Sequence, residues 1–293
     1  MSAANPGGYG KDMFTLSAFA DEIAPDPQVQ IDVLKLCGVR HIEFRSILNT
    51  NVLALNDLQI QEFKSLLDKH GFKLSAIGSP IGKIRIDEPF RPHLEKFKRA
   101  IELCKIFGTP NIRIFSYYPP ESLEWDDCDD HRRAVMDRMW EKCMLAKKAG
   151  VRLLHENEHR IYGESPEHVA DLIETVTAGP DGDVLAAVYD AANYVFGGHD
   201  PMDGWERTKA WTRHLHIKDW KKEDKHGSIP GEGDGQFPRW LADAVKMGYD
   251  GFATMEPHLL GGGPTGGYTG PELFPKAVAA FKKLLDLAGA KYS

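Results

Sequence analysis

The amino-acid sequence predicts an α/β protein built as a single-domain (β/α)8 barrel. Eight short apolar segments, rich in β-branched and aromatic residues, alternate along the chain with amphipathic stretches. The units repeat every ~35 residues, and a length of 293 residues suits one barrel of this kind. The alternative is an open doubly wound sheet, which would have fewer units and a phosphate-binding glycine loop after its first strand. This chain has Ala20, Asp21 and Glu22 there.

The predicted strands follow a first segment, 1–12, that is rich in glycine, alanine, asparagine and proline. We expect this segment to be flexible and the barrel domain to cover 13–293. Each strand is a short run in which apolar, β-branched and aromatic residues dominate. In chain order the strands cover 14–20, 40–44, 72–78, 111–115, 151–156, 184–190, 213–218 and 251–256.

Eight helices are predicted between the strands because apolar residues recur three and four positions apart. The first four are followed by Gly38, Gly71, Gly108 and Gly150, and glycine is common after a helix C-terminus. The fifth begins at Ser165, a capping residue followed by proline and glutamate. In chain order the helices cover 27–37, 57–70, 90–107, 131–149, 165–177, 201–212, 237–247 and 271–289.

Two connections are longer than a barrel needs. The first, 117–130, is acidic and aromatic, and the second, 258–270, is rich in glycine. In the second, Gly261, Gly263 and Gly266 match the pattern GxGxxG, but they do not join a strand directly to a helix. We therefore expect a flexible lid or rim loop there and not a nucleotide site. Loops at the C-terminal ends of the strands carry the function in such barrels.

The composition excludes several classes of protein. The 36 basic and 43 acidic residues give a net charge of −7, which argues against nucleic-acid and anionic-membrane partners. No apolar run approaches the roughly 20 residues that span a bilayer, and the first residues lack the apolar core of a secretion signal. The cysteines, Cys37, Cys104, Cys128 and Cys143, form no CxxC pair, so a reduced, cytoplasmic setting is expected.

Four polar residues stand at the C-terminal ends of the last four predicted strands. They are Glu156, Asp190, His216 and Glu256, at spacings of 34, 26 and 40 residues. In a barrel these strand ends converge on one mouth. Three carboxylates and one imidazole suit a divalent cation such as Mn²⁺, Mg²⁺, Co²⁺ or Zn²⁺. The alternative is that they are ordinary polar residues of a barrel rim.

A competing motif overlaps the first of these residues. His155, Glu156 and His159 match HExxH, in which a helix holds zinc for a metalloprotease. Gly150 ends the preceding helix, however, and an apolar run that predicts a strand follows it. Side chains alternate along a strand, so the two histidines would not share a helical face, whereas Glu156 and Glu158 would both point into the mouth. A protease is therefore not expected.

The seventh predicted strand carries His214 and His216 on one face because side chains alternate along a strand. Only His216 is near enough to the C-terminal end to reach the mouth, so His214 is expected to be a core histidine. Lys218 follows on the same face and could bind a substrate oxygen. A solvated loop lysine is the alternative.

Seven segments, in order along nearly the whole chain, make the sequence resemble the sugar phosphate isomerase/epimerase family, the xylose-isomerase-like TIM barrels. The last three of them together are the most specific part, although they indicate no single substrate. The segments are LSAFADEI (16–23), GVRHIEFRS (38–46), LLHENEHRIYG (153–163), YDAANYV (189–195), HLHIKD (214–219), PGEGDGQF (230–237) and GYDGFATMEPH (248–258).

The resemblance implies one divalent metal ion held by Glu156, Asp190, His216 and Glu256, with Mn²⁺ expected first and Mg²⁺, Co²⁺ or Zn²⁺ as alternatives. In ketose epimerases of the family the two metal-bound glutamates also move protons. By that similarity Glu156 and Glu256 would be the catalytic residues of a sugar or sugar phosphate isomerase/epimerase that works through an enediolate. The partner would be a small carbohydrate, and the family suggests homo-oligomers.

Residues beside the ligands in the sequence are expected to contact the substrate, namely His155, Glu158, His159, Asn193, Lys218 and His258. A second group could shape the pocket, since aromatic rings stack on sugar faces. The alternative for each of its members is packing within a loop. The members are Arg45, Tyr117, Tyr118, Trp125 and Tyr268.

The sequence also departs from the ketose epimerases of the family. They carry a histidine three residues after the aspartate ligand, where this chain has Asn193, and an arginine where it has Lys222. A second class of enzyme therefore stays open, a metal-dependent lyase or dehydratase acting on a keto sugar, keto inositol or 3-keto-glycoside. It would work by β-elimination, with His155 or His159 as the base. A non-catalytic sugar sensor is the third class.

Overall fold

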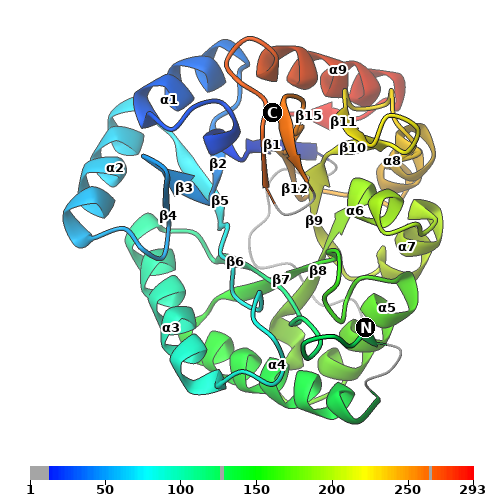
Figure 1. The fold of residues 1–293 in the computed structure, drawn as a ribbon. Helices are drawn as coiled ribbons and strands as arrows, with labels where there is room; N and C mark the ends of the chain where they lie inside the picture. Colours follow the sequence, from blue (N-terminus) through cyan, green and yellow to red (C-terminus); the bar gives the residue numbers. More distant parts are fainter. Residues whose placement is uncertain (1–12, 126–128, 264–265) are drawn as a thin grey trace.

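Eight parallel strands close into a barrel in the computed structural model, which describes residues 13–125, 129–263 and 266–293 (Figure 1). Each strand pairs with the next, and the last pairs with the first through Thr15 and Phe252. The predicted (β/α)8 barrel is therefore confirmed. The barrel strands are β1 (Met13–Ala18), β2 (His41–Phe44), β5 (Lys73–Ile77), β6 (Asn111–Ile114), β7 (Arg152–Glu156), β8 (Leu185–Asp190), β9 (Thr212–Ile217) and β12 (Phe252–Met255).

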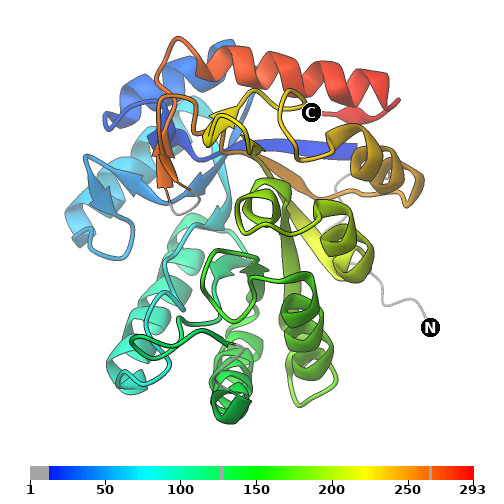
Figure 2. The ribbon, with the colours of Figure 1, turned by 45° about the vertical axis from the view of Figure 1, so that its right-hand side comes forward.

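Helices surround the barrel, and all eight predicted ones are found (Figure 2). Gly71 and Gly108 end two of them in the left-handed conformation, with φ of 70° and 71°. The Ser165 side chain accepts a hydrogen bond from the His168 amide, as expected of a helix cap. The helices are α1 (Pro27–Leu36), α2 (Asp57–His70), α3 (Phe90–Phe107), α4 (Asp129–Ala149), α5 (Pro166–Thr177), α7 (Pro201–Thr208), α8 (Phe237–Lys246) and α9 (Phe274–Leu287).

The core has two parts. Outside the barrel, Phe44 of β2 packs against Phe63 of α2 and Phe107 of α3, with ring centroids 4.5 and 5.4 Å from that of Phe44. Inside it, small apolar side chains, among them Leu154 and Val188, form a separate buried cluster. Leu154 precedes Glu156 by two residues on β7, and Val188 precedes Asp190 by two residues on β8. Side chains two apart on a strand share a face, so both point into the barrel like Glu156 and Asp190. Apolar side chains thus share the barrel interior with a buried polar group, in which His214 contacts Glu43 and Thr254 at 2.8 Å.

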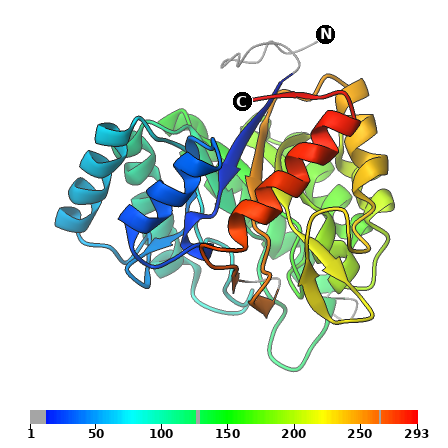
Figure 3. The ribbon, with the colours of Figure 1, turned by 90° about the horizontal axis from the view of Figure 1, so that it is seen from above.

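Several short elements were not predicted. Three antiparallel hairpins stand on the connections, namely β3–β4 (Ser46–Ile47 with Thr50–Asn51), β10–β11 (Asp219–Lys221 with His226–Ser228) and β13–β14 (Gly261–Gly263 with Gly266–Tyr268). The hairpins β10–β11 and β13–β14 lie at one end of the barrel, and the short strand β15 (Lys291–Tyr292) lies at the other (Figure 3). A six-residue helix, α6 (Ala191–Phe196), follows β8 directly.

The described elements decide two of the sequence-based expectations. The glycine-rich connection 258–270 contains the β13–β14 hairpin, so its GxGxxG pattern does not form a strand-to-helix phosphate loop. The HExxH pattern begins on strand β7 and no helix covers it, which excludes the helical zinc-protease geometry. The expected flexibility of 1–12, and Cys128, lie outside the described residues. Within the described part, no helix is both long enough and apolar enough to cross a membrane.

Candidate metal centre

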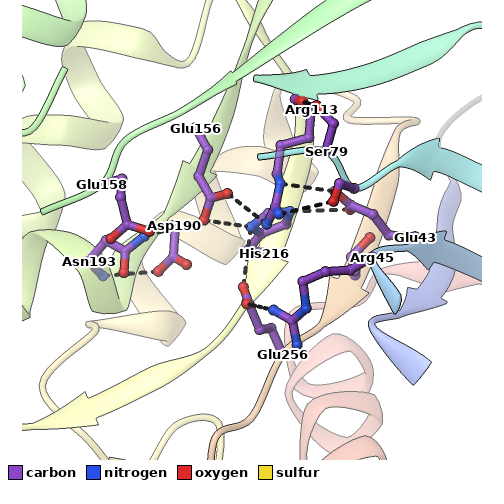
Figure 4. A network of polar contacts seen from close by, with 12 residues as sticks. Glu43, Arg45, Ser79, Arg113, Glu156, Glu158, Asp190, Asn193, His216 and Glu256 are labelled. Carbon is purple, nitrogen blue, oxygen red and sulfur yellow. Dashed lines mark hydrogen bonds and ion pairs between the residues drawn. The ribbon is translucent and has the colours of Figure 1, made fainter. Parts of the chain in front are cut away.

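Four side chains meet at the mouth of the barrel because each stands at the end of a strand (Figure 4). Glu156 and Asp190 are the last residues of β7 and β8, His216 is the last but one of β9, and Glu256 follows β12. One ligand atom from each lies within 4.8 Å of those of the others, and all four residues are buried. The mouth therefore concentrates the predicted ligand set into a volume that one cation could occupy.

The inner atoms of this cluster fit a cation. Asp190 Oδ2, His216 Nδ1 and Glu256 Oε2 are buried and make no hydrogen bond within the part of the chain that the structure describes, although Asp190 Oδ2 forms an ion pair with Lys218 Nζ at 2.9 Å. His216 Nδ1 lies only 3.0 Å from a Glu156 oxygen and 3.4 Å from Glu256 Oε2. Burying polar atoms without a hydrogen bond costs free energy. A divalent cation would satisfy His216 Nδ1 and Glu256 Oε2 and would share Asp190 Oδ2 with Lys218. Oxygen donors with one imidazole nitrogen suit a hard or borderline ion.

A second layer behind His216 fixes the direction of its ring. Its Nε2 lies 3.2 Å from Glu43 Oε2, so Nδ1 is the nitrogen that faces the cluster. The same Glu43 oxygen lies 2.8 Å from His214 Nε2. Although burial raises the pKa of Glu43, the two imidazoles hold it well below its ordinary range. His214 is a buried core histidine, as expected, and a carboxylate behind a ligating histidine is a common arrangement in metal sites.

Two arginines each fix one of the two glutamates. Arg45 Nη1 donates to Glu256 Oε1 at 2.7 Å, and Arg113 Nη1 donates to Glu156 Oε2 at 3.1 Å. Both guanidinium groups lie over the ring of Phe19, 4.4 and 4.8 Å from its centroid. Each glutamate is thus anchored through one oxygen, while its other oxygen faces the cluster. Sequence reasoning missed Arg113 and Phe19, although Phe19 belongs to the first resemblance segment.

Asn193 of α6 connects the ligands of β7 and β8. The backbone nitrogen of Asn193 donates to Asp190 Oδ1 at 3.0 Å, so this oxygen caps helix α6. The other oxygen, Oδ2, remains with the cluster. The Asn193 side chain donates to the Asn157 carbonyl at 2.8 Å and to Glu156 Oε1 at 3.3 Å. Asn193, a predicted substrate contact and the position at which the sequence departs from the ketose epimerases, therefore lies at the candidate centre.

Two lysines complete the mouth. Lys218 is buried, with Nζ 2.9 Å from Asp190 Oδ2 and 3.8 Å from Glu256 Oε2. Lys83, which follows β5, lies 2.9 Å from Glu158 Oε2. Burial raises the pKa of Glu158, and Lys83 opposes this shift. Lys218 and Glu158 thus reach the mouth as predicted, whereas Lys83 lies in a loop and had no signal in the sequence.

His258 lies at the edge of the centre. Its Nε2 is 3.3 Å from Glu256 Oε1 and 3.1 Å from Glu22 Oε1. Glu22 in turn accepts hydrogen bonds from the His258 amide at 2.9 Å and from the Thr269 hydroxyl at 2.7 Å. A Cβ added to Gly267 of β14 would overlap the imidazole ring. The glycine-rich hairpin is therefore packed on the histidine that contacts Glu256.

Two of the predicted substrate contacts point away from the cluster. His155 lies on the face of β7 opposite to Glu156, and its ring packs so closely on Gly163 that a Cβ there would overlap it. His159 is partly exposed, with Nδ1 2.6 Å from Glu164 Oε1. The HExxH spacing placed both histidines near Glu156 in the sequence. Strand alternation turns His155 away from the cluster, and His159, which lies beyond the end of β7, pairs with Glu164 instead.

The candidates for shaping the pocket also divide into residues that reach the centre and residues that do not. Tyr117 is fully buried, and Trp125 donates to the Arg160 carbonyl at 3.1 Å. Both side chains therefore pack within the structure, as the alternative to a role in the pocket predicted. Tyr118 is partly buried and Tyr268 is exposed on the β13–β14 hairpin. Arg45 is the member of this group that reaches the candidate centre.

The fold and this cluster define a class, namely a (β/α)8 barrel whose mouth can hold a metal ion. The chain belongs to the xylose isomerase-like TIM barrel family, whose sequence model matches residues 31–288. It is 23% identical over 207 residues to the fructoselysine 3-epimerase of Shigella flexneri, covering 67% of this chain and 72% of the relative.

Two solved structures share the fold. A D-tagatose 3-epimerase-like protein matches with a TM-score of 0.71 and 15% identity, covering 94% of this chain and 98% of the other. A xylose isomerase-like TIM barrel protein from Mycobacterium smegmatis, in complex with magnesium, matches with a TM-score of 0.68 and 18% identity. That match covers 96% of this chain and 98% of the other.

Proposed function

We propose that the protein is a divalent-metal-dependent isomerase or epimerase of a small carbohydrate. The proposal depends chiefly on one observation, the convergence of the buried side chains of Glu156, Asp190, His216 and Glu256, each with one ligand atom within 4.8 Å of those of the others. Those four residues would hold the ion, and Mn²⁺ remains the first candidate. The names of the relatives add support, since a fructoselysine 3-epimerase and a D-tagatose 3-epimerase-like protein are among them.

In the proposed reaction Glu156 and Glu256 move protons. One glutamate removes a proton from the carbon beside a carbonyl, and the electron pair enters an enediolate. The other glutamate supplies a proton to the opposite face of that carbon, which gives the epimer. Delivery to the former carbonyl carbon gives the isomer instead. A divalent ion bound here would polarise the carbonyl and lower the pKa of the carbon acid.

The remaining residues support these steps. Arg45 and Arg113 each hold the outer oxygen of one glutamate, so the inner oxygens stay directed at the centre. Glu158, Asn193 and Lys218 are the predicted substrate contacts that remain beside it, and they could hold sugar hydroxyl groups. His258 also stays as a candidate through its contact with Glu256.

The β-elimination alternative loses its proposed bases. His155 and His159, which would have served, do not face the ligands. We therefore put the isomerase or epimerase first and leave the lyase as an outcome of the test.

The test is incubation in D₂O of the metal-loaded protein with a panel of ketoses and 3-keto-glycosides. We expect solvent deuterium in an unchanged carbon skeleton, and Glu156→Gln and Glu256→Gln should each slow its incorporation by at least ~100-fold. Glu62→Gln, at an exposed glutamate, is the matched control. Release of a leaving group would indicate the lyase. The absence of bound metal by elemental analysis after dialysis against Mn²⁺ would contradict the proposal.

A further inference from the structure

The charge of the mouth limits what can bind beside the centre. Seven carboxylates contact one another or the same cations there, against four basic side chains. The carboxylates are those of Asp21, Glu22, Glu43, Glu156, Glu158, Asp190 and Glu256, and the basic side chains are Arg45, Lys83, Arg113 and Lys218. The carboxylates of this set thus outnumber its lysines and arginines by three.

Each of these four cations already has a carboxylate partner. Arg45 lies 2.7 Å from Glu256, and Arg113 lies 3.1 Å from Glu156. The shortest contact of each lysine with a carboxylate is 2.9 Å. A phosphate group entering the mouth would therefore have to displace a carboxylate from a cation, and it would be repelled by those that remain.

The position that often binds phosphate in (β/α)8 barrels, the loops after strands seven and eight, is also filled. After the seventh strand, β9, the amides of Gly231, Gly233 and Gly235 all point at one anion. That anion is the side chain of Asp219, which accepts their hydrogen bonds at 2.9, 3.0 and 2.9 Å. The cradle is thus occupied by the protein's own carboxylate.

The lysines of the neighbouring rim are opposed by carboxylates or lie in solvent. The segment 257–273, which follows β12, contains no lysine or arginine. Of the lysines that follow β9, Lys218 pairs with Asp190, Lys221 pairs with Asp224 at 3.0 Å, and Lys225 is exposed. An outer hollow of about 540 Å³ is lined by Lys222, but Asp200 and Asp234 line it as well. The two aspartates oppose the charge of Lys222, so this hollow does not favour a phosphate group either.

We infer that the ligand of this mouth is a polyhydroxylated carbonyl compound that carries no phosphate. The inference depends on the proposed function, because it names the substrate class of the same centre. Hydroxyl groups can both donate to the carboxylates and accept from the lysines, so they suit a mouth of mixed charge that is acidic overall.

The test compares sugars that differ only by a phosphate. Saturation-transfer NMR on the Mg²⁺-loaded protein would use D-fructose with D-fructose 6-phosphate and D-xylulose with D-xylulose 5-phosphate. We expect each free sugar to bind at least about tenfold more tightly than its ester, and excess inorganic phosphate to leave the sugar signal unchanged. Tighter binding of the esters, or displacement of the sugars by phosphate, would overturn the inference.

A variant gives a second measurement. Glu158→Gln removes one carboxylate charge and the ionic partner of Lys83, so it should improve the binding of the ester relative to the sugar. Glu62→Gln should leave the ratio unchanged. If neither substitution changes the ratio of ester binding to sugar binding, the charge of the mouth does not set the preference for the free sugar. Metal binding is measured separately, so loss of the proposed function would be recognised by an absence of bound metal and not by the sugar-to-ester ratio.

Discussion

At the scale of single residues, the two glutamates of the candidate centre differ from ordinary buried acids in how they are held. Arg45 and Arg113 each take one oxygen of one glutamate, and Phe19 lies beneath both guanidinium groups. The side chains cannot rotate without losing these contacts. The arginines thus position the atoms that would bind a metal or accept a proton, without belonging to the ligand set.

Replacing one of these arginines should weaken metal binding. We expect Arg113→Met to lower the affinity for Mn²⁺ by about 10- to 100-fold, because Glu156 loses the contact that orients it. Isothermal titration calorimetry measures the affinity directly. Arg91→Met is the control, since Arg91 is exposed and pairs only at the surface with Glu141. Equal affinities in the two variants would mean that Arg113 does not position Glu156.

Another prediction concerns Lys142, which is fully buried on α4. Within the described residues its one hydrogen bond goes to the Phe115 carbonyl at 3.4 Å, and burial lowers its pKa to about 7. The pKa of lysine in an unfolded chain is about 10.4, so between these values the unfolded chain binds more protons. The free energy of unfolding should therefore rise as the pH increases from about 7 to about 10.

The variant Lys142→Met removes that titration. We expect it to raise the free energy of unfolding at pH 7 by at least about 1 kcal/mol, and to flatten its dependence on pH above 7. Urea unfolding at several pH values gives both quantities. Lys148→Met, at an exposed lysine of the same helix, should change neither. A pH slope that survives in Lys142→Met would show that another group causes it.

At the scale of elements, the hairpins at the mouth attach the loops to the candidate centre. The amides of Thr269 and Gly270, just after β14, donate to the Glu22 carbonyl at 2.9 and 2.8 Å. Gly227 of β11 is so close to the His258 backbone that a Cβ there would overlap it. Two hairpins thus hold His258 from two sides, and His258 contacts Glu256.

This arrangement predicts a difference between two glycines of one hairpin. Gly267→Ala would place a methyl group in the His258 ring, whereas a Cβ at Gly261 meets no atom within 4 Å. We expect Gly267→Ala to lower the free energy of unfolding by about 1–3 kcal/mol and to slow proton exchange of the substrate. Gly261→Ala should behave like the unaltered protein. Calorimetry and the D₂O assay make the comparison, and equal effects would exclude the packing argument.

At the scale of the whole molecule, closing the barrel brings the candidate ligands together. Glu156 and Glu256 are 100 residues apart in the sequence, and parallel pairing through β8 and β9 sets the positions of their strands. Any ion that binds all four ligands should therefore stabilise the barrel as a unit, since the unfolded chain does not hold the ligands near one another.

Stability should accordingly depend on metal. At a Mn²⁺ concentration 100 times the dissociation constant, the expected gain is about 2.7 kcal/mol, which raises Tm by several degrees. Removal of the ion with a chelator should reverse the change. The Asp190→Asn variant, whose ligand oxygen is weakened, should show a much smaller shift. A metal-independent Tm in the unaltered protein would contradict the proposed centre.

Much of this architecture could be predicted from the sequence. The strands and helices were found because their apolar residues repeat with the periods of two and 3.6 that these structures require. The candidate ligand set was predicted because its members end successive strands of a barrel. These are local features, and they need only the order of the residues.

Other features depended on contacts between distant segments. The sequence could not show that Arg113 and Arg45 meet at Phe19, that Lys83 pairs with Glu158, or that Asp219 fills a glycine cradle.

By itself, the sequence determined the barrel and which residues end its strands. Only the tertiary structure decided which side chains face the mouth, how each glutamate is held and where the positive charge is already paired. The physical reason is that periodicity is encoded locally. The side-chain contacts and ion pairs at the mouth exist only when the closed sheet brings eight strand ends together.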